Sequence, residues 1–129
     1  MELKSERQDA INYLKRITRS IPDYPQKGII FRDLTTIFQD EKGMALAIDL
    51  LSEGLQEPAV GERIFDKVVG IEARGFVLAG GVAGKMGGGV VLARKPGKLP
   101  FKKHRVDYML EYGEDGMEMH VDAILPGER

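Results

Sequence analysis

The fold is decided by one stretch of sequence, Val68-Val69-Gly70-Ile71-Glu72-Ala73-Arg74-Gly75-Phe76. The β-branched residues that open it are typical of a buried strand, which we place at residues 64–71. Residues 74–86 follow with the pattern of a helix rich in small residues, and residues 89–93 are a second short apolar strand. Because a strand, a helix and a strand in this order form a parallel βαβ unit, we predict an α/β fold in which helices flank a parallel sheet.

Two amphipathic helices are predicted before this unit. Apolar residues recur at helical spacing over residues 3–20 and again over residues 41–55. Between them, residues 28–32 read as a strand or extended segment. The glycines of Gly80-Gly81-Val82-Ala83-Gly84-Lys85-Met86 resemble a phosphate-binding loop, but the first glycine and the Ser or Thr after lysine are missing. These glycines are therefore expected to allow close helix packing.

The residues after the unit predict a loop and a hairpin. Residues 94–107 are polar and are predicted to be a loop. Residues 108–123 are predicted to form a β-hairpin with its turn at residues 113–116. The second arm alternates in polarity, which places its apolar residues on one packed face.

Composition limits the class of protein. The 129 residues suit one compact domain, residues 1–129, and the absence of cysteine excludes a disulfide framework and thiolate chemistry. The charged N-terminus is no signal peptide, and the longest weakly polar run, residues 75–84, is far shorter than the roughly 20 residues that span a bilayer. We therefore expect a cytoplasmic protein without a membrane partner. His104 and His120 stand alone, so no transition-metal site is expected.

Basic residues gather in one segment although the net charge is −1. No acid interrupts the basic residues between positions 94 and 105, which are Arg94, Lys95, Lys98, Lys102, Lys103 and Arg105. A basic segment on an otherwise acidic chain indicates a local anion site and no general affinity for nucleic acid. The alternative is a solvated charged loop.

Two segments are candidates for that anion site. Glu72-Ala73-Arg74-Gly75 lies where a strand ends and a helix begins, a place where free N–H groups and an arginine suit phosphate. The alternative is a charged loop in which Glu72 caps the helix. In Arg94-Lys95-Pro96-Gly97-Lys98, Pro-Gly fits the centre of a type II turn that brings Lys95 and Lys98 together with Arg94. Such like charges repel unless an anion, for example a diphosphate, lies between them.

Two aromatic sites complete the candidates. Phe31, beside Arg32 and Asp33, offers a face on which a flat base can stack, although a core phenylalanine beside an Arg–Asp ion pair is the alternative. Glu111, within Leu110-Glu111-Tyr112-Gly113, is a carboxylate next to an aromatic ring that can act as general acid or base. Its alternative is a surface glutamate on an edge strand.

In order and spacing these segments resemble the adenine phosphoribosyltransferases, a branch of the type I phosphoribosyltransferases. The resemblance covers essentially the whole chain, and its most specific part is RKPGKLP at residues 94–100 followed by LEYG at residues 110–113. The other matching segments are Gly28-Ile29-Ile30-Phe31-Arg32-Asp33, Gly70 to Phe76, and Asp122-Ala123-Ile124-Leu125-Pro126-Gly127. It implies a type I phosphoribosyltransferase fold with a β-hairpin lid, flexible over residues 99–112.

The resemblance also implies roles for individual residues. Adenine would stack on Phe31, with the backbone of Ile30 and Arg32 reading its edge. The pyrophosphate would be held by Glu72, Ala73, Arg74, Arg94, Lys95 and Lys98, with a non-proline cis peptide between Glu72 and Ala73. Glu111 would transfer the proton, and Tyr112 would cover the purine.

The implied reaction belongs to purine salvage: N9 of adenine displaces pyrophosphate from phosphoribosyl pyrophosphate and gives AMP. Mg²⁺ would be bound through the pyrophosphate of the substrate, and the enzyme would be a homodimer in the cytoplasm. Two alternatives stay open, namely a non-enzymatic purine-sensing regulator of the same fold and a phosphoribosyltransferase for another purine.

One family motif has no counterpart in the sequence. It is the acidic pair and threonine-rich loop that bind the ribose 5′-phosphate, which in relatives follow the segment that matches residues 126–129. We therefore expect residues 1–129 to be an incomplete domain whose C-terminal part is missing. On this expectation the polypeptide continues past Arg129, and the 129-residue chain alone is inactive.

Overall fold

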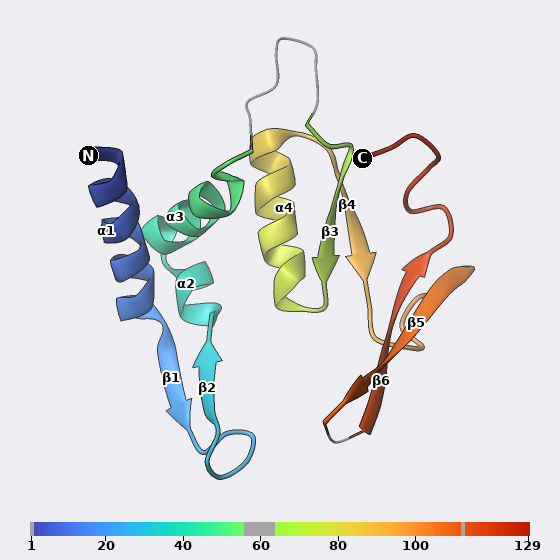
Figure 1. Cartoon of the computed structure of the whole chain (residues 1–129), viewed down its shortest axis with the longest axis horizontal. Helices are drawn as coiled ribbons and strands as arrows, with labels where there is room; N and C mark the ends of the chain where they lie inside the picture. The colour runs from blue at the N-terminus through green and yellow to red at the C-terminus, as the bar shows by residue number, and fades with distance from the viewer. Residues whose placement is uncertain (1, 56–63, 112) are drawn as a thin grey trace. The chain divides into compact units, whose positions relative to one another are not determined.

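The computed structural model describes residues 2–55, 64–111 and 113–129, except for the side chains of residues 2 and 3. The chain divides into two compact units, Met1–Glu53 and Gly54–Arg129 (Figure 1). Whether they belong to one domain, as the sequence predicts, stays a prediction.

The first unit holds three helices and an antiparallel pair of strands. Its elements are α1 (Glu2–Ile17), β1 (Arg19–Pro22), β2 (Ile30–Asp33), α2 (Thr35–Gln39) and α3 (Glu41–Ser52). Asp40 starts α3 as its N-cap, because its Oδ2 accepts the N–H of Gly43 at 2.7 Å. The same oxygen accepts the hydroxyl of Tyr13 at 2.7 Å and thereby ties α1 to the start of α3.

The predicted helix over residues 3–20 is wrong at its C-terminal end, because α1 stops at Ile17 and residues 19–22 form β1. The carbonyl of Leu14 accepts both the backbone N–H and the hydroxyl of Thr18, at 3.0 and 2.7 Å, which closes the last turn. Pro22 then disfavours a helical conformation at the residue before it. The second predicted helix also ends early, at Ser52, and the short α2 was not predicted.

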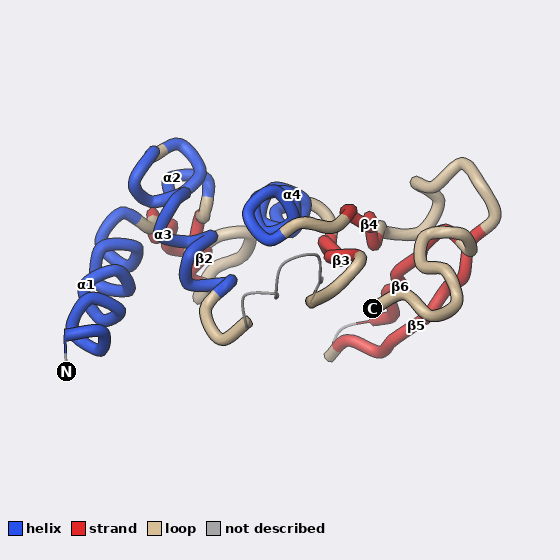
Figure 2. Tube along the Cα trace, turned by 90° about the horizontal axis from the view of Figure 1, so that it is seen from above, coloured by secondary structure: helices blue, strands red, loops and turns tan. Residues whose placement is uncertain are grey.

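The second unit contains the predicted βαβ motif. Its elements are β3 (Lys67–Ile71), α4 (Arg74–Met86), β4 (Gly89–Ala93), β5 (Lys103–Leu110) and β6 (Gly113–His120). β3 and β4 pair in parallel from Lys67 opposite Gly89 to Ile71 opposite Ala93. The helix and the second strand have the predicted bounds, and Figure 2 looks along α4, which lies beside both strands.

The β3–β4 sheet is buried at some positions and exposed at others. Val91 and Ala93 of β4 are buried, as are Ala79, Val82 and Ala83 of α4. Gly70 allows the close approach of α4, because an added Cβ would lie 2.7 Å from the carbonyl oxygen of Gly75. Exposed aliphatic side chains occur on both faces of the sheet: Val69 and Ile71 on the face of their partners Val91 and Ala93, and Val90 and Leu92 on the opposite face.

The hairpin is longer than predicted. β5 and β6 pair from Lys103 opposite His120 to Leu110 opposite Gly113, so the predicted loop over residues 94–107 and the predicted turn at residues 113–116 are wrong. Every residue of β5 is exposed except the half-buried Tyr108. Such a strand has no apolar face, and its sequence therefore lacks the alternation that reveals a strand.

Gly80 and Gly84 of α4 do not pack closely against another described element. A Cβ added at Gly80 or Gly84 would meet no atom within 4 Å in the described part of the chain, contrary to the prediction. Neither α4 nor any other helix in the described ranges combines the length and apolar character needed to cross a membrane.

Candidate functional site

The parallel strands bring two candidate residues to one edge of the sheet. Glu72 follows β3 and Arg94 follows β4. The N–H of Glu72 donates to the carbonyl of Ala93 at 3.0 Å, which extends the pairing by one residue. The peptide between Glu72 and Ala73 is cis, as expected, and α4 begins at the next residue, Arg74.

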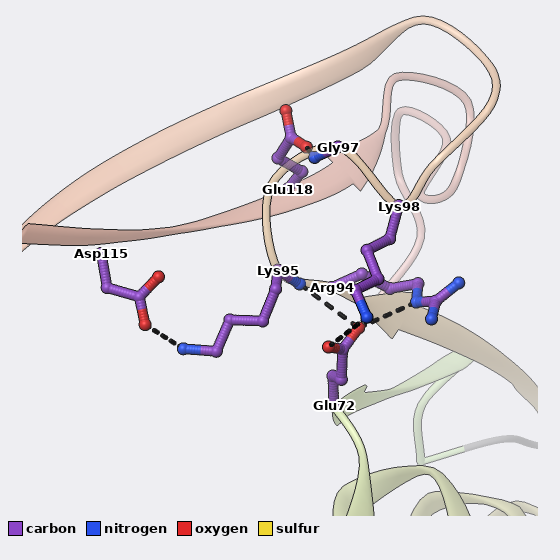
Figure 3. Close-up of polar contacts among 7 residues, drawn as sticks. All are labelled: Glu72, Arg94, Lys95, Gly97, Lys98, Asp115 and Glu118. Atoms are coloured by element: carbon purple, nitrogen blue, oxygen red, sulfur yellow. Dashed lines mark hydrogen bonds and ion pairs between the residues drawn. The ribbon is translucent and has the colours of Figure 1, made fainter.

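The carboxylate of Glu72 is surrounded by cations and an N–H donor (Figure 3). Arg94 Nε lies 2.9 Å from Oε1, Lys98 Nζ lies 3.9 Å from Oε2, and the N–H of Lys95 lies 3.4 Å from Oε1. Partial burial acts to raise the pKa of Glu72, but the hydrogen bonds from Arg94 and Lys95 and the charge of Lys98 outweigh it and lower the pKa. Glu72 does not cap α4, because the N-cap is Ala73 without a side-chain bond.

The predicted convergence of three cations is correct for two of them. Arg94 and Lys98 meet at Glu72, whereas the amine of Lys95 turns to the carboxylate of Asp115 and lies 3.3 Å from the hydroxyl of Tyr108. The hydrogen bond to Asp115, and then the one to Tyr108, raise the pKa of Lys95. The anion between the remaining two cations is thus the protein's own carboxylate.

The turn over residues 95–98 rests on β6. Gly97 has φ +82°, as position i+2 of a type II turn requires, and its N–H donates to Oε1 of Glu118 at 2.6 Å. Arg94 and Glu118 also exchange two backbone hydrogen bonds of 2.9 and 2.8 Å. The turn is therefore held by both the backbone and the side chain of Glu118.

Sequence reasoning missed Asp115, Tyr108 and Glu118. The predicted hairpin packed Met117 and Met119, but the structure buries Gly116 and Glu118 most deeply. An acid between two methionines carries no local sign of burial. Only the pairing of β6 with Arg94, which is distant in sequence, brings it to the turn.

The remaining candidates of the second unit are exposed. Ala73 and Arg74 lie at the start of α4. Glu111 lies in the connection between β5 and β6 and not on a strand arm as predicted. Tyr112, expected to cover a purine, is outside the described residues.

The base-binding candidates belong to the first unit, in β2. Ile30 is 58% exposed, and the half-buried Phe31 packs edge-on against Tyr24 with ring centres 5.2 Å apart. Arg32 donates to the hydroxyl of Ser20. Asp33 forms an ion pair at 3.3 Å with Arg19. The alternative of a core phenylalanine beside an Arg–Asp ion pair had implied the adjacent Arg32 as the partner.

Comparison with known proteins identifies the family. No protein-family model matches the chain. The crystal structure of adenine phosphoribosyltransferase from Saccharomyces cerevisiae, solved with adenine and an imino-altritol bisphosphate, superposes with a TM-score of 0.82 at 33% identity. The match covers 94% of this chain and 68% of the yeast chain. The chain belongs to the adenine phosphoribosyltransferase family.

Other members of the adenine phosphoribosyltransferase family are more similar in sequence. The enzyme of Geobacter metallireducens is 53% identical over 116 residues, which is 90% of this chain and 65% of that protein. The structure from Rhodothermus marinus gives a TM-score of 0.83 at 44% identity and covers 95% of this chain and 66% of that one. The predicted family and the type I phosphoribosyltransferase fold are confirmed, and the chain spans about 65% of the length of the curated relatives from Geobacter metallireducens and Geotalea daltonii.

Proposed function

We propose that the protein to which these residues belong transfers the phosphoribosyl group of phosphoribosyl pyrophosphate to adenine, giving AMP and pyrophosphate. The observation that carries the proposal is the pair Arg94 and Lys98, which holds the carboxylate of Glu72 at the C-terminal edge of two parallel strands. Ligands of open α/β sheets bind at this edge. A site that holds one anion through two cations is suited to a diphosphate, and the members of the matched family are named for this transfer.

The diphosphate would bind between the Glu72–Arg74 loop and the turn. Arg94 and Lys98 would exchange the carboxylate of Glu72 for phosphate oxygens, and Lys95 would leave Asp115 to join them. No group of three or more His, Asp or Glu side chains suited to a metal occurs among the described residues. Mg²⁺ would enter on the diphosphate of the substrate, because Mg²⁺ commonly binds through substrate phosphates.

The base would bind in the first unit. Adenine would stack on Phe31 while the backbone of Ile30 and Arg32 reads its edge. Glu111 would act as the proton-transfer group, with Tyr112 over the purine and residues 99–112 as the lid that excludes water. As N9 attacks C1′, the sugar gains oxocarbenium character, and the cations stabilise the charge that grows on the departing pyrophosphate. We further propose a cytoplasmic homodimer.

The test is AMP synthesis by the protein expressed from its natural coding sequence, with adenine, phosphoribosyl pyrophosphate and Mg²⁺. We expect AMP and pyrophosphate in equal amounts, and lower turnover with Lys98→Met. Lys4→Met, at an exposed position of α1 outside the proposed site, is the matched control and should behave as the unsubstituted protein. Purine binding without turnover would favour the sensing regulator. If guanine or hypoxanthine were turned over faster than adenine, that base would be the substrate in place of adenine.

A further inference from the structure

We propose that Glu118 is a positioning residue for the diphosphate site. It holds the turn over residues 95–98 on β6 and thereby keeps Lys95 and Lys98 in place. This inference rests on the proposed function, because its consequence is measured as pyrophosphate binding.

The first step concerns the turn. Type I and type II turns differ mainly in which way their central peptide faces, and only type II needs a positive φ at its third residue. Pro96 fixes its own φ but suits both types, so proline alone does not select between them. Gly97 has φ +82°, the type II value. Glu118 accepts, at 2.6 Å, the N–H of this same central peptide.

The second step concerns how β6 fits beneath the turn. The backbone of Glu118 pairs with Arg94, at the residue before the turn begins. Two residues earlier in β6, a Cβ added at Gly116 would lie 3.3 Å from Cγ of Pro96. The strand therefore contacts Arg94, just before the turn, and Pro96 and Gly97 within it.

The third step concerns Glu118 itself, which is 4% exposed. A buried carboxylate is costly unless hydrogen bonds satisfy it, and the N–H of Gly97 supplies one. Figure 3 shows that the two glutamates contact different groups. Glu72 forms ion pairs with the side chains of Arg94 and Lys98, whereas Glu118 accepts a hydrogen bond from the backbone between the two lysines. A turn released from Glu118 would no longer hold the two lysines in place, although the charges of the site would be unchanged.

The experiment separates reach from charge in the protein expressed from its natural coding sequence. Glu118→Asp keeps the charge but shortens the side chain by one methylene, and Glu118→Gln keeps an acceptor oxygen at full reach. We expect Glu118→Asp to raise the Kd of pyrophosphate with Mg²⁺ about tenfold or more and Glu118→Gln to change it less than about threefold. The Kd of adenine should be unchanged in both, and Glu114→Gln, at an exposed position of β6, is the control.

A second readout reports on the contact directly. The amide proton of Gly97 should exchange faster in Glu118→Asp than in Glu118→Gln. The inference is overturned if Glu118→Gln weakens pyrophosphate binding as much as Glu118→Asp, because charge would then matter more than reach. It is also overturned if Glu118→Asp binds pyrophosphate normally, or if it weakens both ligands equally as the melting temperature falls. If the unsubstituted protein binds no pyrophosphate, the proposed function itself fails. If it binds pyrophosphate but the variants do not behave as expected, only the inference about Glu118 fails.

Discussion

Glu72 is the residue on which the charges of the site depend. Its carboxylate bridges Arg94 and Lys98, and these contacts outweigh the effect of burial and keep its pKa low. The carboxylate is therefore ionised at neutral pH and competes with any incoming anion. A diphosphate carries more negative charge than a carboxylate and can offer an oxygen to each cation at once. The exchange that we propose thus replaces a weaker anion by a stronger one.

Glu111 is the residue whose role depends most on the proposed function. It is exposed in the connection of the hairpin, at the tip of the proposed lid. We predict that Glu111→Gln lowers kcat about 10²- to 10⁴-fold, the usual effect of losing a general acid–base group, while adenine binding changes little. Steady-state kinetics and adenine titration measure the two quantities, with Glu114→Gln as the control. An unchanged kcat would reduce Glu111 to a surface residue.

The pair of Lys95 and Asp115 predicts a pH dependence of stability. The hydrogen bonds from Lys95 and from the N–H of Gly116 lower the pKa of Asp115 below its ordinary value of 3.8 in the folded chain. A lowered folded pKa means that the contribution to stability is complete above the unfolded pKa and is lost as the pH falls through the folded pKa. Asp115→Asn should therefore lower the melting temperature at pH 7 and flatten its decline below about pH 4. Melting temperatures measured as a function of pH test this. If the melting temperature fell with the same slope in both proteins between pH 2 and 4, the prediction would be contradicted.

At the scale of elements, the hairpin of β5 and β6 is the part most suited to local opening. Within the described ranges β5 pairs with no strand other than β6, and it exposes all its residues except Tyr108, which is half-buried. Few buried apolar contacts and solvent-exposed hydrogen bonds are the marks of low local stability. β3 and β4, by contrast, lie against α4 with Val91 and Ala93 buried.

We therefore predict that the lid, residues 99–112, exchanges its amide protons fastest among the internal segments described by the structure when no ligand is bound. AMP should slow this exchange, because the proposed lid closes over it. The amides of β3 and β4 serve as the internal reference and should be protected in both states. Equal and strong protection of residues 100–107 with and without AMP would contradict the prediction.

The elements also show what a sequence can predict. The βαβ unit was predicted with the bounds of α4 and β4 because its strands are apolar runs and its helix is rich in small residues. The meeting of Glu72 with Arg94 could be anticipated, since neighbouring parallel strands end at one edge. The strands β1 and β5 could not be predicted, because the sequence of β1 continues a helical spacing and β5 has no buried face. The contact of Glu118 with Gly97 could not be predicted either, because it depends on pairing between segments that are distant in sequence.

At the scale of the whole molecule, the proposed ligand contacts are divided between the two compact units. The segment proposed to bind the base, Ile30 to Arg32, belongs to Met1–Glu53. The cations proposed to bind the diphosphate belong to Gly54–Arg129. Phe31 packs against Tyr24, and Arg94 and Lys98 contact Glu72. Because adenine and pyrophosphate would meet different residues, we expect their binding to be separable by substitution.

We predict that Phe31→Leu weakens adenine binding about tenfold through loss of stacking and leaves the Kd of pyrophosphate unchanged. Lys98→Met should do the reverse, weakening pyrophosphate about tenfold through loss of a charged contact while adenine binds normally. Titration of both ligands into both variants, expressed from the natural coding sequence, measures all four values, and Lys4→Met, at an exposed position of α1, should match the unsubstituted protein in each. Leucine and methionine keep apolar side chains of similar length, so general unfolding is a weak explanation for any loss, and melting curves check it. If Phe31→Leu weakened pyrophosphate as much as adenine, the contacts would not divide between the units, and Phe31 would be a core residue whose loss disturbs the protein as a whole.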